Sequence, residues 1–484
     1  MAAPRIWPWL LLVALCGLGL RGWEAAESSL WLDELHTLHH ASQPDLAAVV
    51  ASVRRDVHTP FFFGFVHLFG GWESGASLRA IPALSSLLVL ILLLHLARGL
   101  ELSAAGVLLA AWLYATLPYQ VAYGSELRPY CWVGLFSAAL VTVAFSERGS
   151  VPARLGLFFV FVLLGMWVHR LMAVTVAAVC LARLVVSRPK MIRLPGMIAA
   201  GVLGVAGFLP WLLGFAQRAT VARVEHAAAA GEHWIRPALL KEILFLPVRL
   251  VSPYAGFLGG VWEPLAKLGA ALFGLCLLAA VLLSARGLAR RRGPPRHSLL
   301  VGLAVFLVAS FSLTAGLSIY RWDTVPLQYF TAAAWTLPLF FAAIMDAAKP
   351  ERRKRPLVVG LAVLSLAMGV ALAGGTSRED VRRATRVAVE FGAELEHPIY
   401  TALLRQPPSF PNVTPYRAYA PSIEPVEPAD LPRPGDPDFD RPVVVIHRAV
   451  GAGRPEWNPI RTGRTVTRRA EIDKFLTVLV FEPE

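Results

Sequence analysis

Charged residues are scarce in this chain of 484 residues, where Asp, Glu, Lys and Arg make up 16% and hydrophobic residues 56%. A soluble domain ordinarily has about a quarter charged residues. The mean hydropathy is +0.56, and the apolar residues form long runs instead of an alternating pattern. The composition therefore excludes an ordinary soluble protein and indicates an integral membrane protein.

Cysteine is also rare, and none of the four cysteines stands in a spacing typical of a metal site. All four fall within apolar stretches: Cys16, Cys131, Cys180 and Cys276. Cysteines in such surroundings are predicted to be small hydrophobic core residues. A structural disulfide is not expected.

Acidic residues are outnumbered, with 33 Asp and Glu against 46 Lys and Arg, so that the net charge is +13. The cations cluster in short loops between apolar runs, which is the pattern of the positive-inside rule. No nucleic-acid recognition module is visible in the sequence. The positive charge is therefore attributed to membrane topology, and nucleic acid is not expected as a partner.

The apolar runs predict a mainly α, polytopic membrane protein with about 11 transmembrane helices, because a span takes about 20 apolar residues. The predicted spans are 7–22, 78–97, 103–119, 130–146, 154–168, 171–187, 195–214, 264–285, 298–319, 327–347 and 356–374. The fifth and sixth spans are separated only by His169 and Arg170. The first run could also be a signal peptide, but a retained anchor fits the charge topology better.

Counting Lys and Arg over the short loops predicts the orientation. One set of alternate loops, on the side of Arg5, holds the dense clusters: Arg98; Arg148 and Arg154; Arg183, Arg188, Lys190 and Arg193; Arg286, Arg290, Arg291, Arg292 and Arg296; Lys349, Arg352, Arg353, Lys354 and Arg355. We expect this side to be cytoplasmic. The opposite face then receives the first loop 23–77, the large loop 215–263 and the chain from residue 375.

Two domains are predicted from the change in composition near residue 375. Residues 1–374 form the transmembrane domain, whereas 375–484 is polar and rich in proline. The second part contains an amphipathic helix over 378–396 and two β-rich runs, "RPVVVIH" and "FLTVLVF". We expect a small extracytoplasmic α/β subdomain.

Ionisable residues gather on the predicted extracytoplasmic face. "WLDELHTLHH" follows the first span with Asp33 and Glu34, and "DVHTPFFFGFVHLFG" surrounds His58 with aromatic residues typical of a juxtamembrane helix. "YGSELRPYCW" opens the fourth span with Glu126, Arg128 and Tyr130, and the His169–Arg170 pair joins two spans. Ionisable groups at membrane depth are costly and usually mark a functional site.

Each of these features also has a structural interpretation. Asp33 could cap a juxtamembrane helix, Arg128 could contact lipid phosphate, and His169–Arg170 could be a polar turn. Their occurrence together on one face, with aromatic residues beside each, favours a shared cavity.

The ordered series of these motifs, over roughly residues 5–350, resembles the polytopic GT-C glycosyltransferases. It is most similar to the bacterial branch of protein O-mannosyltransferases and lipid A aminoarabinose transferases. The chain departs from that family in three places. His58-Thr59-Pro60 replaces a frequent His-Pro-Pro, Arg170 replaces a Tyr, and Gln328-Tyr329 replaces an Arg-Tyr pair.

The resemblance implies a membrane glycosyltransferase that moves a sugar from a polyprenyl-phosphate carrier to an extracytoplasmic acceptor in the plasma (inner) membrane. The acceptor could be a protein, lipid A or an envelope glycan. By match to the family's Asp-Glu motif, Asp33 is the first candidate for the general base and Glu34 the second, and a single base implies inversion. The candidate donor-phosphate and substrate residues are His58, Glu126, Arg128, Tyr130, His169, Arg170 and Trp234. Trp234 could equally be an interfacial belt residue.

Two alternatives stay open at this point. His36 and His40 have the i, i+4 spacing that places two imidazoles on one helix face, so a divalent metal is a weaker possibility; exposed loop histidines are the simpler interpretation. A transporter or flippase of a lipid-linked glycan precursor would also use cations at membrane depth. It would favour inverted repeats or paired broken helices near the midplane, which the sequence does not indicate.

Overall fold

The computed structural model describes most of the helical part of the chain and short segments of the remainder. The described residues are 6–54, 58–70, 75–186, 191–214, 264, 268, 271–272, 294–322, 327–347, 351–375, 381–394, 400–402, 424–426, 442–448, 464–472 and 476–483.

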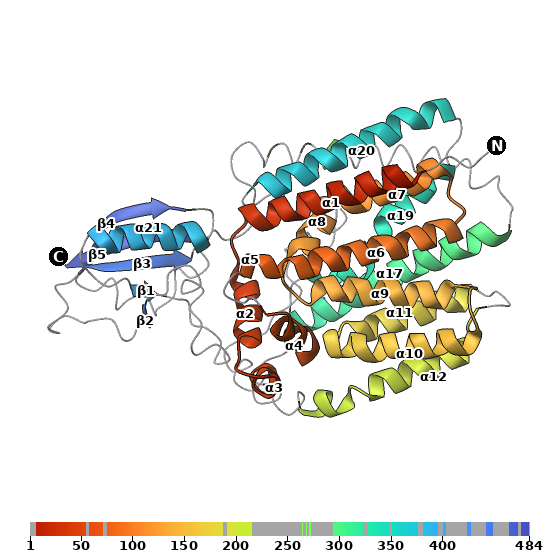
Figure 1. Ribbon diagram of the computed structural model, residues 1–484, viewed down its shortest axis with the longest axis horizontal. Coiled ribbons are helices and arrows are strands. Elements are labelled where there is room, and N and C mark those ends of the chain that lie inside the picture. Colours follow the sequence, from red (N-terminus) through yellow and green to blue (C-terminus); the bar gives the residue numbers. More distant parts are fainter. Residues whose placement is uncertain are drawn as a thin grey trace.

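Apolar helices of 13 to 29 residues lie side by side and form the body of the protein (Figure 1). They are α1 (Trp7–Glu27), α6 (Ala80–Gly99), α9 (Tyr130–Phe145), α10 (Val151–Val168), α11 (Met172–Val185), α12 (Leu194–Ala206), α17 (Pro294–Trp322) and α20 (Glu351–Gly374). In the described part of the chain, five helices are long and apolar enough to cross a membrane, or up to seven if each bent pair is one span. The 20 residues of α6 extend about 30 Å, the thickness of the hydrocarbon core. The chain is an integral membrane protein.

Two of the predicted spans are broken helices. α7 (Ala104–Thr116) bends by 55° into α8 (Pro118–Ser125), and the segment Leu327–Ala334 bends by 50° into the following helix. That segment consists of η2 (Leu327–Phe330) and α18 (Thr331–Ala334), and α19 (Thr336–Ala347) continues it. Pro118 has no amide hydrogen to continue α7 but suits the first turn of α8. The span predicted over 103–119 ends as α7 at Thr116, and the chain continues as α8, which is helical and buried.

A buried arginine on α1 supports the first of these breaks. Arg21 Nη1 donates to the carbonyls of Gly17 and Ala115, and Nη2 donates to the carbonyl of Gln120 at 2.9 Å. The carbonyls in the last turn of α7 lack helical partners, and a cation there also complements the helix dipole. Arg21 therefore fixes α8, which leads directly to Glu126 and Arg128.

Short helices cover one end of the bundle (Figure 1). These are α2 (Leu32–Ala41), α3 (Leu46–Arg54), α4 (Pro60–Phe69) and α5 (Gly75–Leu78). α4 begins with Pro60 and ends at Gly70, whose φ of 74° suits glycine. It buries Phe62 and Phe63 and leaves Phe65 and Leu68 exposed. Such an exposed apolar face fits the juxtamembrane helix predicted for the first loop.

The predicted spans coincide with helices or bent pairs wherever the chain is described; the span 264–285 lies largely outside the described residues. The number of transmembrane helices therefore stays a prediction. Arg98 lies over the ring of Trp7 at 5.1 Å, so that a predicted cytoplasmic loop and the start of α1 share one end of the bundle. Figure 1 shows α2, α3 and α4 at the other end.

Beyond residue 375, the described residues form one helix and two small sheets. α21 (Val381–Glu394) matches the predicted amphipathic helix. β3 (Val443–Arg448) and β5 (Leu476–Pro483) match the two β-rich runs, and β4 (Arg464–Glu471) pairs with the other edge of β5, giving the antiparallel order β3-β5-β4. β1 (Tyr400–Ala402) and β2 (Glu424–Val426) pair in parallel. In Figure 1 this part lies beside the end of the bundle that carries α2.

Candidate functional site

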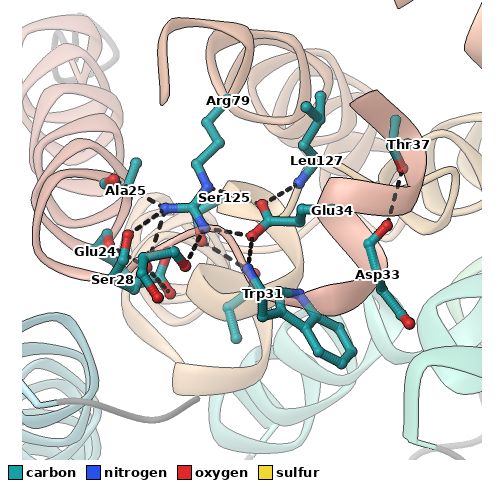
Figure 2. A network of polar contacts seen from close by, with 12 residues as sticks. Glu24, Ala25, Ser28, Trp31, Asp33, Glu34, Thr37, Arg79, Ser125 and Leu127 are labelled. Atoms are coloured by element: carbon teal, nitrogen blue, oxygen red, sulfur yellow. Dashed lines mark hydrogen bonds and ion pairs between the residues drawn. The ribbon is translucent and has the colours of Figure 1, made fainter. Parts of the chain in front are cut away.

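The most buried ionic interaction at this end joins Glu34 of α2 to Arg79 at the start of α6. Arg79 Nε donates to Glu34 Oε1 at 2.8 Å, and Nη2 forms a second contact with Oε2. The two side chains are 1% and 0% exposed. The remaining N–H groups of Arg79 donate to acceptors at the end of α1 and just after it: the carbonyls of Ala25, Ser28 and Ser29 and the hydroxyl of Ser28 (Figure 2).

Glu34 also accepts two backbone hydrogen bonds. Leu127 N–H donates to Oε1 at 2.9 Å, and Trp31 N–H donates to Oε2 at 3.3 Å. The contact with Trp31 caps the first turn of α2, where a carboxylate is favourable. Glu34 and Arg79 thus join the end of α1, α2, α6 and the turn that precedes Arg128. A carboxylate so fully engaged is poorly suited to accept a proton from a substrate, which argues against the second candidate for the base.

Asp33 is more exposed than Glu34 and lies next to a different cation. Its side chain is 34% exposed, and Figure 2 shows it pointing away from the Glu34–Arg79 pair. Asp33 Oδ2 lies 3.8 Å from Arg128 Nη2. The predicted Asp-Glu pair is therefore divided into a buried structural carboxylate and a half-buried one next to a cation.

Arg128 is the centre of the cluster. Nη1 donates to the carbonyl of Asp33 at 2.8 Å and contacts Thr37 Oγ1 and His36 Nδ1 at 3.3 Å, while Nη2 contacts His58 Nε2 at 3.1 Å. All four of these acceptors are neutral groups or can be so. Its guanidinium is 3% exposed, and the carboxylate of Asp33 lies 3.8 Å from Nη2.

Aromatic rings from three segments surround the cation. Arg128 lies 5.8 Å from the ring centre of Tyr130, and Tyr130 is 5.5 Å from His169 and 6.1 Å from Tyr329 between ring centres. His169 is also 6.5 Å from His58. The bend before α19 brings Tyr329 into this group.

His169 occupies the turn between α10 and α11 and accepts a hydrogen bond from Leu171 N–H through Nδ1. Burial, together with the nearby charges of Arg170 and Arg128, lowers the pKa of His169 to about 3. Its imidazole is therefore neutral at physiological pH. It can contribute a hydrogen bond or a ring face to a ligand but no charge.

His36 and His40 are buried and contact each other, with 2.9 Å between their Nε2 atoms. The expectation of exposed loop histidines is wrong, because α2 packs on α3 and α4 and encloses both rings. Within the described residues, no three or more His, Cys, Asp or Glu side chains are grouped to hold a metal ion.

The other predicted residues are placed as follows. Glu126 is buried at the end of α8, and Arg170 is half-buried beside His169. Trp234 lies outside the described residues. Two further residues at the site were not among the candidates from the sequence: Arg79, and Trp211, whose Nε1 donates to the carbonyl of His58 at 3.2 Å. Tyr329 was noted only as part of the departure at Gln328-Tyr329. Arg79 had one visible signal, as an isolated cation at the start of an apolar run.

Comparison with solved structures finds the same fold in ArnT from Cupriavidus metallidurans. Its structure in the apo state has 13% sequence identity with this chain, covers 98% of each chain and gives a TM-score of 0.53. The structure bound to undecaprenyl phosphate has 12% identity, covers 99% of this chain and 98% of that chain, and gives a TM-score of 0.52. No protein-family model and no curated protein matches the chain. This likeness shows that the chain has the fold of ArnT.

Proposed function

We propose that this chain, which has the GT-C fold of ArnT, is a membrane glycosyltransferase that moves a sugar from a polyprenyl-phosphate carrier to an acceptor hydroxyl. The observation that carries the proposal is the half-exposed carboxylate of Asp33, 3.8 Å from the buried guanidinium of Arg128, at one end of the helical bundle. A base next to a fixed cation is what transfer from a phosphate leaving group requires.

In the proposed reaction, Asp33 accepts the proton of the acceptor hydroxyl while the hydroxyl oxygen attacks the anomeric carbon of the sugar. The bond between that carbon and the phosphate oxygen breaks, and its electron pair stays on the phosphate. Arg128 stabilises the resulting negative charge, because it is already oriented and excluded from water. One direct displacement inverts the anomeric configuration.

The aromatic group beside Arg128 supports a sugar site at this position. Tyr130, Tyr329 and the neutral imidazole of His169 offer ring faces and hydrogen-bonding atoms together. The sugar is a hexose or a pentose in this proposal, and the acceptor is a protein, lipid A or an envelope glycan. A polyprenyl carrier is supported by the ArnT structure bound to undecaprenyl phosphate.

The proposed orientation places Asp33 and Arg128 on the extracytoplasmic face of the plasma (inner) membrane, with the chain from residue 375 on the same side. It is supported by the clusters of Lys and Arg in alternate loops. A reporter enzyme fused after Gly375 tests it. Activity of an extracytoplasmic reporter is expected, and activity of a cytoplasmic reporter would contradict the orientation.

The function is tested with membranes containing the protein and a panel of radiolabelled polyprenyl-phosphate hexoses and pentoses. We expect protein-dependent transfer of label from one of them to an acceptor fraction, with release of polyprenyl phosphate. Movement of intact carrier across proteoliposomes without cleavage of the sugar would instead identify a flippase and contradict the proposal.

A further inference from the structure

A line of four side chains leads from Arg128 to α3. His36 Nδ1 lies 3.3 Å from Arg128 Nη1, His36 Nε2 lies 2.9 Å from His40 Nε2, and His40 Nδ1 lies 2.7 Å from Ser52 Oγ. His36 is 5% exposed and both His40 and Ser52 are buried. The i, i+4 spacing on α2 places one imidazole directly after the other.

Arg128 determines the direction of every hydrogen bond in this line. A guanidinium can only donate, so His36 Nδ1 must accept and its proton must be on Nε2. His40 Nε2 then accepts from His36 and His40 carries its proton on Nδ1, from which it donates to Ser52 Oγ. Each imidazole is thereby neutral and restricted to one tautomer.

An additional proton on either ring does not fit this geometry. On His36 it would direct an N–H at the guanidinium of Arg128, and on His40 it would direct an N–H at the N–H of His36. Four segments surround the two imidazoles. They contribute Asp33 and His39 from α2, Ser52 from α3, His58 and Phe63 from the start of α4 and just before it, and Arg128 from the turn before α9.

The neutral state of the pair also suits the task of Arg128. A buried guanidinium needs hydrogen-bond acceptors, and a second carboxylate in this position would neutralise it. Imidazole nitrogens from His36 and His58 orient the guanidinium without adding a second negative charge beside that of Asp33.

We propose, on the basis of the function proposed above, that His36 and His40 are positioning residues that hold Arg128 toward the donor phosphate.

The test compares three variants with the wild type. The double variant His36→Gln/His40→Gln keeps an acceptor and a donor at each position. His40→Leu removes the acceptor for His36 Nε2–H. His39→Gln changes the neighbouring imidazole as a matched control. The values of kcat and KM for sugar transfer are measured at pH 7.5.

We expect His40→Leu to lower kcat about tenfold, the size of one lost hydrogen bond, and to change KM less. His39→Gln should match the wild type. The double variant, which keeps an acceptor for the guanidinium, should be more active than His40→Leu. A His40→Leu variant with the kcat of the wild type, or a double variant no more active than His40→Leu, would overturn the proposal.

A second measurement separates this proposal from the proposed function. Purified protein in detergent should bind undecaprenyl phosphate more weakly as His40→Leu than as His39→Gln, whether or not any sugar is transferred. Equal binding by the two variants would overturn the positioning role even if transfer is found. Stabilisation of the wild type, but not of the double variant, by added zinc would identify the pair as a metal site and also overturn it.

Discussion

The guanidinium of Arg79 and the carboxylate of Glu34 form an ion pair closed off from solvent, although 45 residues separate them in the sequence. Because Glu34 directly follows Asp33, this pair also determines where the Asp33 carboxylate lies on α2. The same Glu34 carboxylate binds the backbone of Leu127, next to Arg128. One buried pair thus aligns both members of the proposed reaction centre.

Removal of the charge of Glu34 should destabilise the protein. In Glu34→Gln, Arg79 stays buried without a counter-ion, and loss of one partner of a buried pair typically costs about 3–5 kcal/mol. Thermal unfolding in detergent should show a clear fall in melting temperature, whereas Asp33→Asn, the matched control, should melt close to the wild type. Equal melting temperatures for the two variants would contradict the division of roles.

A methyl group at Gly124 should disturb the support of the turn before Arg128. A Cβ atom there would meet Arg21 Nε and Ser86 Oγ too closely, whereas a Cβ at Gly22 meets nothing within 4 Å. Overpacking typically costs about 1–3 kcal/mol. Gly124→Ala should therefore lower the melting temperature, and Gly22→Ala should leave it unchanged or raise it slightly. The reverse order would argue against the close contact of α8 with α1.

The charge of Arg128 should matter for the reaction and its planar geometry for precise orientation. Loss of one fixed electrostatic donor typically lowers kcat by about 10²–10³, and we expect such a loss in Arg128→Met. Arg128→Lys keeps a charge but cannot satisfy several acceptors in a plane, so intermediate activity is expected. The rate of sugar transfer is measured for both variants, and their melting temperatures are the control for folding. Full activity in Arg128→Met would exclude the proposed role.

The buried imidazole of His169 should make the fold sensitive to acid. Its pKa is about 3 in the folded protein, against about 6.5 for an ordinary histidine, so the unfolded chain binds more protons between these values. Stability therefore falls as pH falls from about 6.5 towards 3. Between pH 7 and 4.5, the melting temperature of His169→Gln should fall less than that of the wild type. A loss as large as that of the wild type would contradict this.

The sequence predicts the helical membrane fold well, since long apolar runs need only local periodicity to be recognised. The break at Leu117 is missed because the apolar run continues through Pro118, and the hydrogen bonds from Arg21 to the broken ends come from another helix. The number of spans stays a prediction where the chain is not described.

The sequence predicts several residues of the candidate cluster but not the role of each residue. Asp33, His58, Arg128, Tyr130 and His169 do gather at one end of the bundle, as the motifs suggest. Nothing in the local sequence distinguishes Asp33 from Glu34, because their difference depends on Arg79. The i, i+4 spacing of His36 and His40 on α2 also does not predict that they are buried, because their burial depends on α3 and α4.

The most direct test of the account is sugar transfer by Asp33→Asn from the polyprenyl-phosphate sugar that the wild type uses, with carrier binding measured in parallel. Loss of a general base typically lowers the rate by about 10²–10⁴. We predict a loss of that size with undecaprenyl phosphate still bound and the melting temperature unchanged. Full transfer activity in this variant would contradict the assignment of Asp33 as the base.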